Sequence, residues 1–275
     1  MLSPEMNSLA PWEGDSPGLA ERSVKSAERT LALFELFSLC QRPLTIGQIA
    51  DTMNIPQPSV TMLVRNLVRI GYLEHDRADR TYLPTIRIML LGSWVHQRFN
   101  FESNLEARLD VLMKRCDETV LLGLQNRLYC QYVCAQLPDR PNRLEIQTGM
   151  LRPLTRTAIG RVLLSAKSDS EISLIVRRCN AEFPSLALGL SEFMKIIEKV
   201  RSDGFAETNG DMTEGHGVIA VAIPTPVGNI PMAAGVGGEI SRVNGKRALI
   251  VKALRDLRDD LSASLEEKNP RFEAA

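Results

Sequence analysis

Two short amphipathic helices joined by a tight turn most constrain how this chain can fold, and both lie within residues 45–70. The first is predicted over "TIGQIADTMN", with Thr45 as its N-cap because a side-chain oxygen there can accept hydrogen bonds from the first-turn amides. The turn "IPQP" follows, and Pro58 suits the first turn of a second helix that runs to Ile70. Gly71 then supplies the left-handed conformation that often ends a helix. The pattern therefore predicts a helix-turn-helix.

The second helix has two different faces. At about 100° per residue, four aliphatic residues gather on one side and predict a buried stripe of Val60, Leu63, Val64 and Leu67. The opposite side carries no acidic residue and consists of Pro58, Thr61, Met62, Arg65, Asn66 and Arg69. Such side chains can contact phosphates and the base edges of a DNA major groove. In an isolated helix, simple solvent exposure would be the better explanation of the arginines, so the neighbouring elements decide.

Those neighbouring elements complete a DNA-binding fold. A helix is predicted over "SVKSAERTLALFELFSLC", capped by Ser23 or Ser26, with an inward stripe of Val24, Ala27, Leu31, Phe34 and Phe37. After Gly71, two short strands enclose the polar turn "HDRADR", which places Arg77 and Arg80 at its tip. Three helices and a hairpin predict a winged helix-turn-helix over residues 23–85, a domain that puts one helix in a groove and the hairpin on the adjacent backbone of double-stranded DNA.

The bulk composition leaves the partner to local features. The chain has 275 residues, with 33 basic and 33 acidic side chains, so its net charge argues neither for nor against nucleic acid. Its five cysteines are scattered without CxxC spacing and are expected to be reduced thiols rather than zinc ligands or disulfides. Neither a secretory signal nor an apolar run of about 20 residues is visible. We expect a cytoplasmic protein with no metal, no cofactor and no membrane partner.

The remaining segments predict a second domain. Residues 1–22 contain three prolines, two glycines and no periodicity, which predicts a flexible tail. A linker helix is expected over 86–101, followed by an α+β domain over 102–268 with a mostly antiparallel sheet. Its strands are predicted at "TVLLGLQ", "LYCQYVCAQ", "FAETN", "GHGVIAVAIP" and "NIPMAAGVGG", and one final amphipathic helix from about Ser241 to Glu266.

An enzyme with an appended DNA-binding domain is one alternative, and its signature motifs are missing. Of the three histidines, His75 and His96 fall in the winged helix and linker, so a catalytic triad would have only His216. No GxSxG, Walker A, HExxH or GxGxxG motif occurs. We therefore expect no catalysis. Another alternative is a second domain that serves assembly only and binds no small molecule.

The chain as a whole resembles a known family. "SAERTLALFELFSLCQRPLTIGQIADTMNIPQPSVTMLVRNLVRIGYLEHDRADRTYLPTIRIMLLG" is similar to the winged-helix domain of the IclR family of bacterial transcriptional regulators. "GMLRPLTRTAIGRVLLSA" and "RSDGFAETNGDMTEGHGVIAVAIPTPVGNIPMAAGVGGEISRV" resemble the family's effector-binding domain, and the similarity covers about residues 23–265. The resemblance implies homodimers or dimers of dimers that bind operators through paired winged helices. It also implies a GAF-like α/β domain that senses a small-molecule effector and alters DNA affinity or promoter activity.

The recognition helix departs from the family pattern. Members often carry Ser-Thr-x-x-Arg at its start, whereas the matching residues here are Pro58, Ser59 and Met62, and "QPSVT" is closer to the MarR group of winged-helix regulators. Family rules for base preference therefore do not transfer to this chain. The expected DNA contacts are Thr45, Gln57, Ser59, Thr61, Met62, Arg65, Asn66, Arg69, Arg77 and Arg80.

The resemblance also places the effector contacts, at Thr157, Ile159, Gly160, Thr208, His216, Val218, Gly235 and Gly237. In members that sense very small carboxylates, several of these positions are Asp, Cys or Ser. Here Thr208 replaces the acid, Val218 replaces the thiol, and two glycines replace the hydroxyls, so we expect a roomier, more apolar pocket for an acid larger than glyoxylate.

Plainer interpretations of the same residues stay open. Gly235 and Gly237 are equally consistent with close strand packing, and His216 with a structural hydrogen bond. Arg152 and Arg156 either balance an anionic effector or are surface charges.

Overall fold

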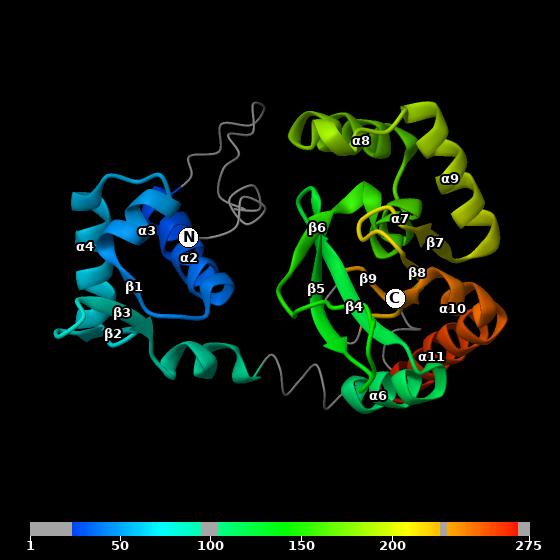
Figure 1. The fold of residues 1–275 in the computed structure, drawn as a ribbon, viewed down its shortest axis with the longest axis horizontal. Coiled ribbons are helices and arrows are strands. Elements are labelled where there is room, and N and C mark those ends of the chain that lie inside the picture. The colour runs from blue at the N-terminus through cyan, green and yellow to red at the C-terminus, as the bar shows by residue number, and fades with distance from the viewer. Residues whose placement is uncertain (1–23, 95–103, 226–229, 269–275) are drawn as a thin grey trace. The chain divides into compact units, whose positions relative to one another are not determined.

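The computed structural model describes residues 24–94, 104–225 and 230–268 of the 275, in two compact units, Met1–His96 and Gln97–Ala275 (Figure 1). The predicted fold class is confirmed, because the first unit is a winged helix-turn-helix and the second is a mixed α/β unit around an antiparallel sheet. The expected N-terminal tail lies outside the described residues.

The first unit packs three helices against a small sheet. The helices are α2 (Lys25–Cys40), α3 (Ile46–Thr52) and α4 (Gln57–Arg69). The strands lie in the order β1 (Leu44–Thr45), β3 (Thr81–Pro84) and β2 (Leu73–Asp76), and both pairings are antiparallel. β1 was not predicted from the sequence. It pairs Thr45 with Thr81 and so ties the start of α3 to the hairpin.

The predicted ends of α3 and α4 are confirmed where local chemistry sets them. Thr45 caps α3 through a capping box, in which Oγ1 accepts from the amide of Gln48 at 3.3 Å and the Thr45 amide donates to the Gln48 side chain at 2.9 Å. Gly71 follows α4 with φ of 80°, a conformation that strains residues with a Cβ.

The prediction for α2 was wrong in two respects. Its N-cap is Val24, with no side-chain cap, rather than Ser26. The predicted inward stripe is also displaced, because Val24 and Leu31 are 65% and 67% exposed. Of the predicted stripe Phe37 is buried, and the helix also buries Ala32, Leu33 and Leu36. The helix is apolar on more than one side, so its periodicity alone did not identify the side that packs inward.

A short helical stretch leaves the hairpin and is tied to α4. Residues 87–94 of the predicted linker 86–101 are helical, and the rest of that linker lies outside the described residues. Arg87 donates from Nη1 to the carbonyl of Ile70 at 2.7 Å, and its guanidinium lies 4.7 Å from the ring centre of Tyr72. Thr85 donates to the carbonyl of Gly71 at 2.7 Å. The end of the recognition helix and the start of the linker helix are thus joined by side-chain bonds.

The second unit is built on a six-stranded antiparallel sheet in the order β6-β5-β4-β9-β8-β7. The strands are β4 (Thr119–Asn126), β5 (Tyr129–Gln136), β6 (Leu151–Pro153), β7 (Ala206–Asn209), β8 (His216–Ile223) and β9 (Met232–Glu239). The helices are α6 (Leu105–Cys116), α7 (Ala158–Ser165), α8 (Asp169–Glu182), α9 (Leu190–Asp203), α10 (Ile240–Gly245) and α11 (Arg247–Lys268), with short 3-10 turns at Leu154–Arg156 and Pro184–Leu186.

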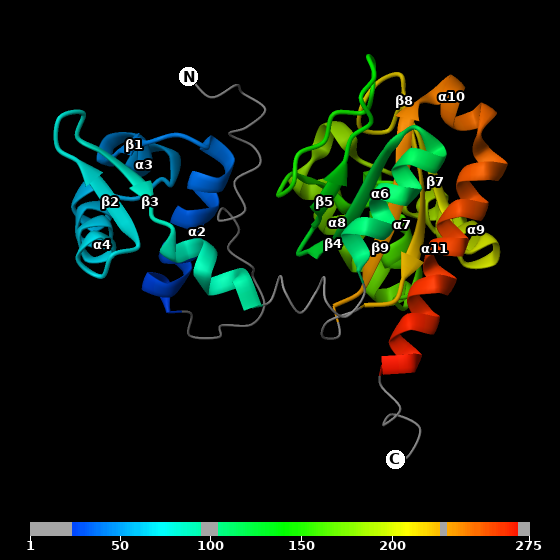
Figure 2. The same cartoon turned by 90° about the horizontal axis from the view of Figure 1, so that it is seen from below.

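The sheet separates two hydrophobic cores, because successive strand residues point to opposite faces. Along β9, Ala234 and Val236 pack into a core with α6, α10 and α11, whereas Ala233 packs into a core with α7, α8 and α9. Figures 1 and 2 show these two groups of helices on opposite sides of the sheet. The "TAIG" segment at the start of α7 therefore faces only one of the two cores.

The C-terminal region differs from the prediction of one helix. It forms two helices, α10 and α11, separated at Lys246. All five cysteines lie in the described part of the chain and are free thiols. None of the helices in the described ranges has the length and apolar character needed to cross a membrane.

Candidate nucleic-acid interface and ligand cavity

The exposed side of α4 carries the polar residues that the sequence singled out. Met62 is 73% exposed, and Arg65, Asn66 and Arg69 are also exposed. The predicted buried stripe is confirmed at Val60, Val64 and Leu67, while Leu63 is only partly buried. The helix therefore packs through one side and presents the other to solvent.

Two local hydrogen bonds order this exposed side. Arg69 donates from Nη2 to Oδ1 of Asn66 at 2.7 Å, and Thr61 donates to the carbonyl of Gln57 at 2.8 Å. Gln57 is exposed at the first turn and Ser59 is half-buried. Thr45 precedes α4 in the chain, and its side chain caps α3.

The wing is shaped by Asp76. Its Oδ1 accepts hydrogen bonds from the amides of Ala78 at 2.8 Å and Asp79 at 3.3 Å, an Asx-type turn. Arg77 and Arg80 are both exposed in this turn, and Arg80 adopts a φ of 54°. One of the two carboxylates in the turn, that of Asp76, is thus bonded to backbone amides, and both arginines of the turn are exposed.

A cavity lies in the second unit, on the face of the sheet covered by α7. It is lined by Tyr132, Leu144, Ile146, Arg152, Arg156, Thr157, Ala158, Ile159, Thr208, Met212, Thr213, His216 and Val218. Five of the expected effector contacts are therefore brought together: Thr157, Ile159, Thr208, His216 and Val218. The volume of the cavity is about 30 Å³, room for about two water molecules.

Three expected contacts, all glycines, do not line the cavity. A Cβ at Gly160 would lie 1.9 Å from the carbonyl oxygen of Leu154, so this position serves close packing of α7 on the preceding turn. A Cβ at Gly237 would lie 2.7 Å from Cδ2 of Leu144, and one at Gly235 would lie 3.2 Å from Cγ1 of Val218. The space that these two strand glycines leave is occupied by neighbouring side chains, so it does not enlarge the cavity.

The two arginines at the cavity differ in how they are held. Arg156 donates to the carbonyls of Leu186 at 2.7 Å and Ala187 at 2.9 Å, so its guanidinium is occupied by backbone. Arg152 makes no hydrogen bond or ion pair with any described residue. It is a cation at the cavity without a counterion in the described part of the chain.

His216 presents a second unsatisfied polar group. Its Nδ1 lies 3.1 Å from the carbonyl oxygen of Glu214, and its Nε2 is buried without a partner among the described residues. A carbonyl can only accept, so Nδ1 carries the hydrogen, and in neutral imidazole Nε2 is then an acceptor. Burial also raises the pKa of Tyr132, so its phenol stays protonated.

The loop that precedes His216, residues 210–215, is held in place by the buried side chain of Arg161. Arg161 on α7 donates to the carbonyl of Glu207 at 2.8 Å and to Oδ1 of Asp211 at 2.6 Å. This places the following residues, Met212 and Thr213, on the cavity wall.

Several lining residues were missed by sequence reasoning: Tyr132, Leu144, Ile146, Met212 and Thr213. Leu144 and Ile146 belong to an irregular segment, and their alternation in "NRLEIQ" was the available signal. Within the described residues, no group of His, Cys, Asp and Glu is arranged to hold a metal ion.

Comparison with known families follows the same division into two units. Residues 26–77 match the IclR helix-turn-helix domain, and residues 95–263 match the family described as bacterial transcriptional regulator IclR C-terminal. This chain belongs to the IclR family of bacterial transcriptional regulators. The family is one of regulators and not of enzymes.

Individual IclR relatives have low sequence identity to this chain, but the alignments cover most of both proteins. The chain is 24% identical over 243 residues to the Pca regulon regulatory protein of Pseudomonas putida, covering 85% of this chain and 83% of that protein. It is 24% identical over 251 residues to the glycerol operon regulatory protein of Streptomyces coelicolor, covering 89% of this chain and 97% of that one.

Solved structures show the same fold. An IclR regulator from Alicyclobacillus acidocaldarius superposes with a TM-score of 0.76 at 20% identity, covering 88% of this chain and 99% of that structure. An IclR homologue from Microbacterium hydrocarbonoxydans, complexed with 4-hydroxybenzoate, gives a TM-score of 0.71 at 14% identity, covering 88% and 99%.

Proposed function

We propose that this IclR-type transcriptional regulator binds its operator through the exposed side of α4 and the wing, and that an organic acid in the cavity of the second unit controls that binding. The DNA contacts proposed are those expected from the sequence, with Arg65, Asn66 and Arg69 at the centre. Their exposure on one side of a helix anchored by Val60 and Val64 supports this assignment.

The observation that carries the effector proposal is the pair of unpartnered groups at the cavity. Arg152 offers a cation without a counterion, and His216 offers a buried Nε2 without a donor. Much of the remaining lining is apolar, including Leu144, Ile146 and Ile159. A ligand that satisfies both groups has a carboxylate, an apolar body and a hydrogen-bond donor such as a hydroxyl.

This chemistry agrees with one solved relative. That IclR homologue, from Microbacterium hydrocarbonoxydans, is complexed with 4-hydroxybenzoate. We therefore propose an aromatic or similarly apolar hydroxy acid as the effector class, larger than glyoxylate.

Isothermal titration calorimetry against 4-hydroxybenzoate, benzoate and glyoxylate tests this class. We expect the order of affinity to be 4-hydroxybenzoate, then benzoate, then glyoxylate. Arg152→Met should weaken binding by about tenfold or more, the size expected for losing a charge-assisted hydrogen bond. Arg177→Met, at an exposed position of α8 away from the cavity, is the matched control and should bind normally. Binding of glyoxylate alone, or unchanged affinity in Arg152→Met, would contradict the proposal.

The regulatory step needs its own measurement. Fluorescence anisotropy should use DNA from the promoter region of the gene that encodes this protein. The affinity for that DNA should change when an acid that binds in the calorimetric experiment is added. If the acid binds and the DNA affinity stays constant, the second unit serves assembly rather than sensing.

We also propose that the chain self-associates through apolar residues that the first unit leaves exposed. These lie on α2 and on the stretch 86–94, and include Val24, Leu31, Ile86, Met89, Leu90 and Trp94. Exposed apolar clusters of this kind mark protein interfaces. Sedimentation analysis should give a homodimer or a dimer of dimers, and Leu31→Glu should shift the population toward monomer. A monomeric wild-type chain would rule this out.

A further inference from the structure

The cavity is too small for the effector proposed above, so a wall must move to admit it. Its volume of about 30 Å³ holds about two waters and not an acid with an aromatic body. This inference rests on the proposed function, because it concerns how that same cavity opens. The question is which wall can yield.

Two parts of the lining come from irregular segments, and one of them, the loop with Met212 and Thr213, is held in place by the bonds of Arg161. Strands β5 and β8 and helix α7 supply Tyr132, Val218 and Ile159, and these elements are fixed by the sheet and the core. Leu144 and Ile146 instead belong to the cover segment, residues 137–150, which joins β5 to β6 without a helix or strand. Leu144 lines the cavity and fills the space above Gly237.

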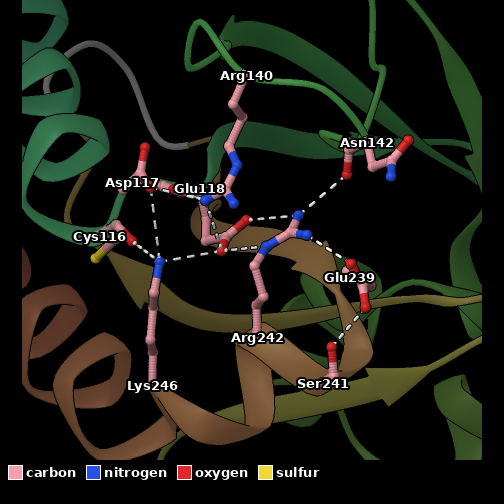
Figure 3. Close-up of polar contacts among 9 residues, drawn as sticks. All are labelled: Cys116, Asp117, Glu118, Arg140, Asn142, Glu239, Ser241, Arg242 and Lys246. Carbon is pink, nitrogen blue, oxygen red and sulfur yellow. Dashed lines mark hydrogen bonds and ion pairs between the residues drawn. The ribbon is translucent and has the colours of Figure 1, made fainter.

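The cover segment is tied to a buried charge cluster centred on Glu118 (Figure 3). Glu118 is 0% exposed and receives Arg242 Nε at 2.9 Å and Lys246 Nζ at 3.1 Å. Arg140 of the cover segment lies farther away, with Nη1 at 3.5 Å from Oε1. With Asp117 and Glu239, the cluster holds three carboxylates and three cations, so its charges balance.

The three cations are held unequally. Arg242 and Lys246 come from α10 and its junction with α11, and they satisfy Glu118 directly. Arg140 is held mainly by Asp117, donating to Oδ2 at 2.7 Å and to the main-chain carbonyl at 3.0 Å, and its buried Nε has no partner among the described residues. When Arg140 moves away, Glu118 is still paired with Arg242 and Lys246. The Arg140 bonds can therefore break without leaving a buried charge unpaired.

Two other bonds seat the cover segment. Thr119 donates from Oγ1 to the carbonyl of Leu144 at 2.9 Å, and Arg242 donates to the carbonyl of Asn142 at 3.0 Å. Neither involves a side chain of the cover segment itself. Arg140 is the side chain of the cover segment that bonds to the end of α6, through Asp117.

We propose that Arg140 is a positioning residue that latches the cover segment to the C-terminal end of α6, so that opening the cavity for the effector releases that helix end. Asp117 is the C-cap of α6, and its amide bonds to the carbonyl of Met113 at 2.7 Å. α6 is the first described helix after the chain leaves the DNA-binding unit. The latch therefore connects the wall of the cavity to the helix next to the junction of the two units.

Hydrogen–deuterium exchange of the full-length chain, without DNA or acid, tests the latch. Arg140→Met should exchange about tenfold faster in two places, the cover segment and the end of α6 around residues 113–117, which corresponds to one lost charge-assisted hydrogen bond. The matched control is Arg143→Met in the same segment, because Arg143 bonds only within it, to Glu145 at 2.7 Å and the carbonyl of Pro138 at 2.9 Å. That variant should loosen the cover segment and leave α6 unchanged. Arg140→Lys should restore part of the protection.

The affinity for the acid gives a second measurement. A substitution that only disrupted the fold would weaken acid binding, whereas loss of the latch should strengthen it. In the wild-type chain, part of the binding free energy of the effector is used to break the Arg140 bonds and open the cavity. Arg140→Met should therefore bind 4-hydroxybenzoate more tightly than wild type does. Faster exchange confined to the cover segment, or none in either place, would overturn the latch, and so would weaker acid binding in a folded Arg140→Met. If the wild-type chain binds no acid, the proposed effector class fails, while the exchange experiment still decides whether the latch exists.

Discussion

Arg69 and Asn66, one turn apart on the exposed side of α4, form a hydrogen bond of 2.7 Å from Nη2 to Oδ1. A guanidinium has only donors, so the Asn66 atom facing Arg69 must be the oxygen. The amide nitrogen of Asn66 therefore points away from Arg69. The bond pre-orients an amide that can form paired hydrogen bonds with adenine in a major groove.

Arg65→Ala and Arg69→Ala should both weaken operator binding, with different signatures. Loss of Arg65 should lower affinity evenly across DNA sequences and, if it contacts phosphate, reduce the salt dependence by about one unit. Loss of Arg69 should also relax base preference, because Asn66 loses its orienting partner. Anisotropy titrations over a salt series, on the operator and on single-base variants, measure both effects. Equal affinities at matched salt would remove these residues from the interface.

Arg87→Ala should destabilise the first unit at the end of α4. The substitution removes the bond to the Ile70 carbonyl and the contact with the Tyr72 ring, a loss of about 1–2 kcal/mol. Urea unfolding followed by circular dichroism measures the change. Arg77→Ala in the exposed wing turn is the control and should unfold at the wild-type urea concentration. Equal midpoints for the two variants would show that the Arg87 bonds add nothing.

Gly237→Ala should destabilise the second unit, because the new methyl would lie 2.7 Å from Leu144 and 2.8 Å from Val218. Overpacking of this kind costs about 1–3 kcal/mol. Combining it with Leu144→Ala should recover part of the loss, since the smaller side chain vacates the contested space. Chemical denaturation of the single and double variants measures the coupling. A Gly237→Ala chain as stable as wild type would show that Leu144 yields freely.

The buried thiols should be inert in the folded chain. Burial raises the pKa of Cys130 to about 12 and that of Cys116 and Cys179 to about 11, from the ordinary thiol value of 9.0. The thiolate is the reactive form, so iodoacetamide at pH 8 should label these residues only after unfolding. The same shifts favour the folded state fully below pH 9, and that contribution is lost as the pH rises from 9 toward 11 and 12. Rapid labelling of Cys130 in the native protein would contradict the burial.

The helix-turn-helix was predictable because its signals are local. Thr45, Pro58 and Gly71 act through their own backbone geometry, and each was found where the pattern placed it. The buried side of α2 was not predictable, because Val24 and Leu31 continue an apolar stripe that packs against nothing within the described first unit. Periodicity identifies apolar sides of a helix but not which of them faces the core.

The ligand cavity was predictable only in part, for a different reason. Ile159, Thr208, His216 and Val218 lie on helices and strands, and Thr157 caps α7, so the family resemblance carries over their spacing. Tyr132, Leu144, Ile146, Met212 and Thr213 reach the cavity through strand order and loop paths, which are tertiary facts. The small volume of Gly235 and Gly237 did not predict a larger cavity, because the side chains of Leu144 and Val218 occupy the space beside them.

The sheet that separates the two cores also separates two kinds of evolutionary change. Substitutions at cavity positions such as Arg152 or Val218 alter the face covered by α7, while Leu109 and Leu254 pack the other face independently. A regulator built this way can acquire a new effector without rebuilding the side that α6 and α11 cover. For the same reason, a biosensor engineer can randomise the cavity side as a library while holding the opposite face constant as the scaffold.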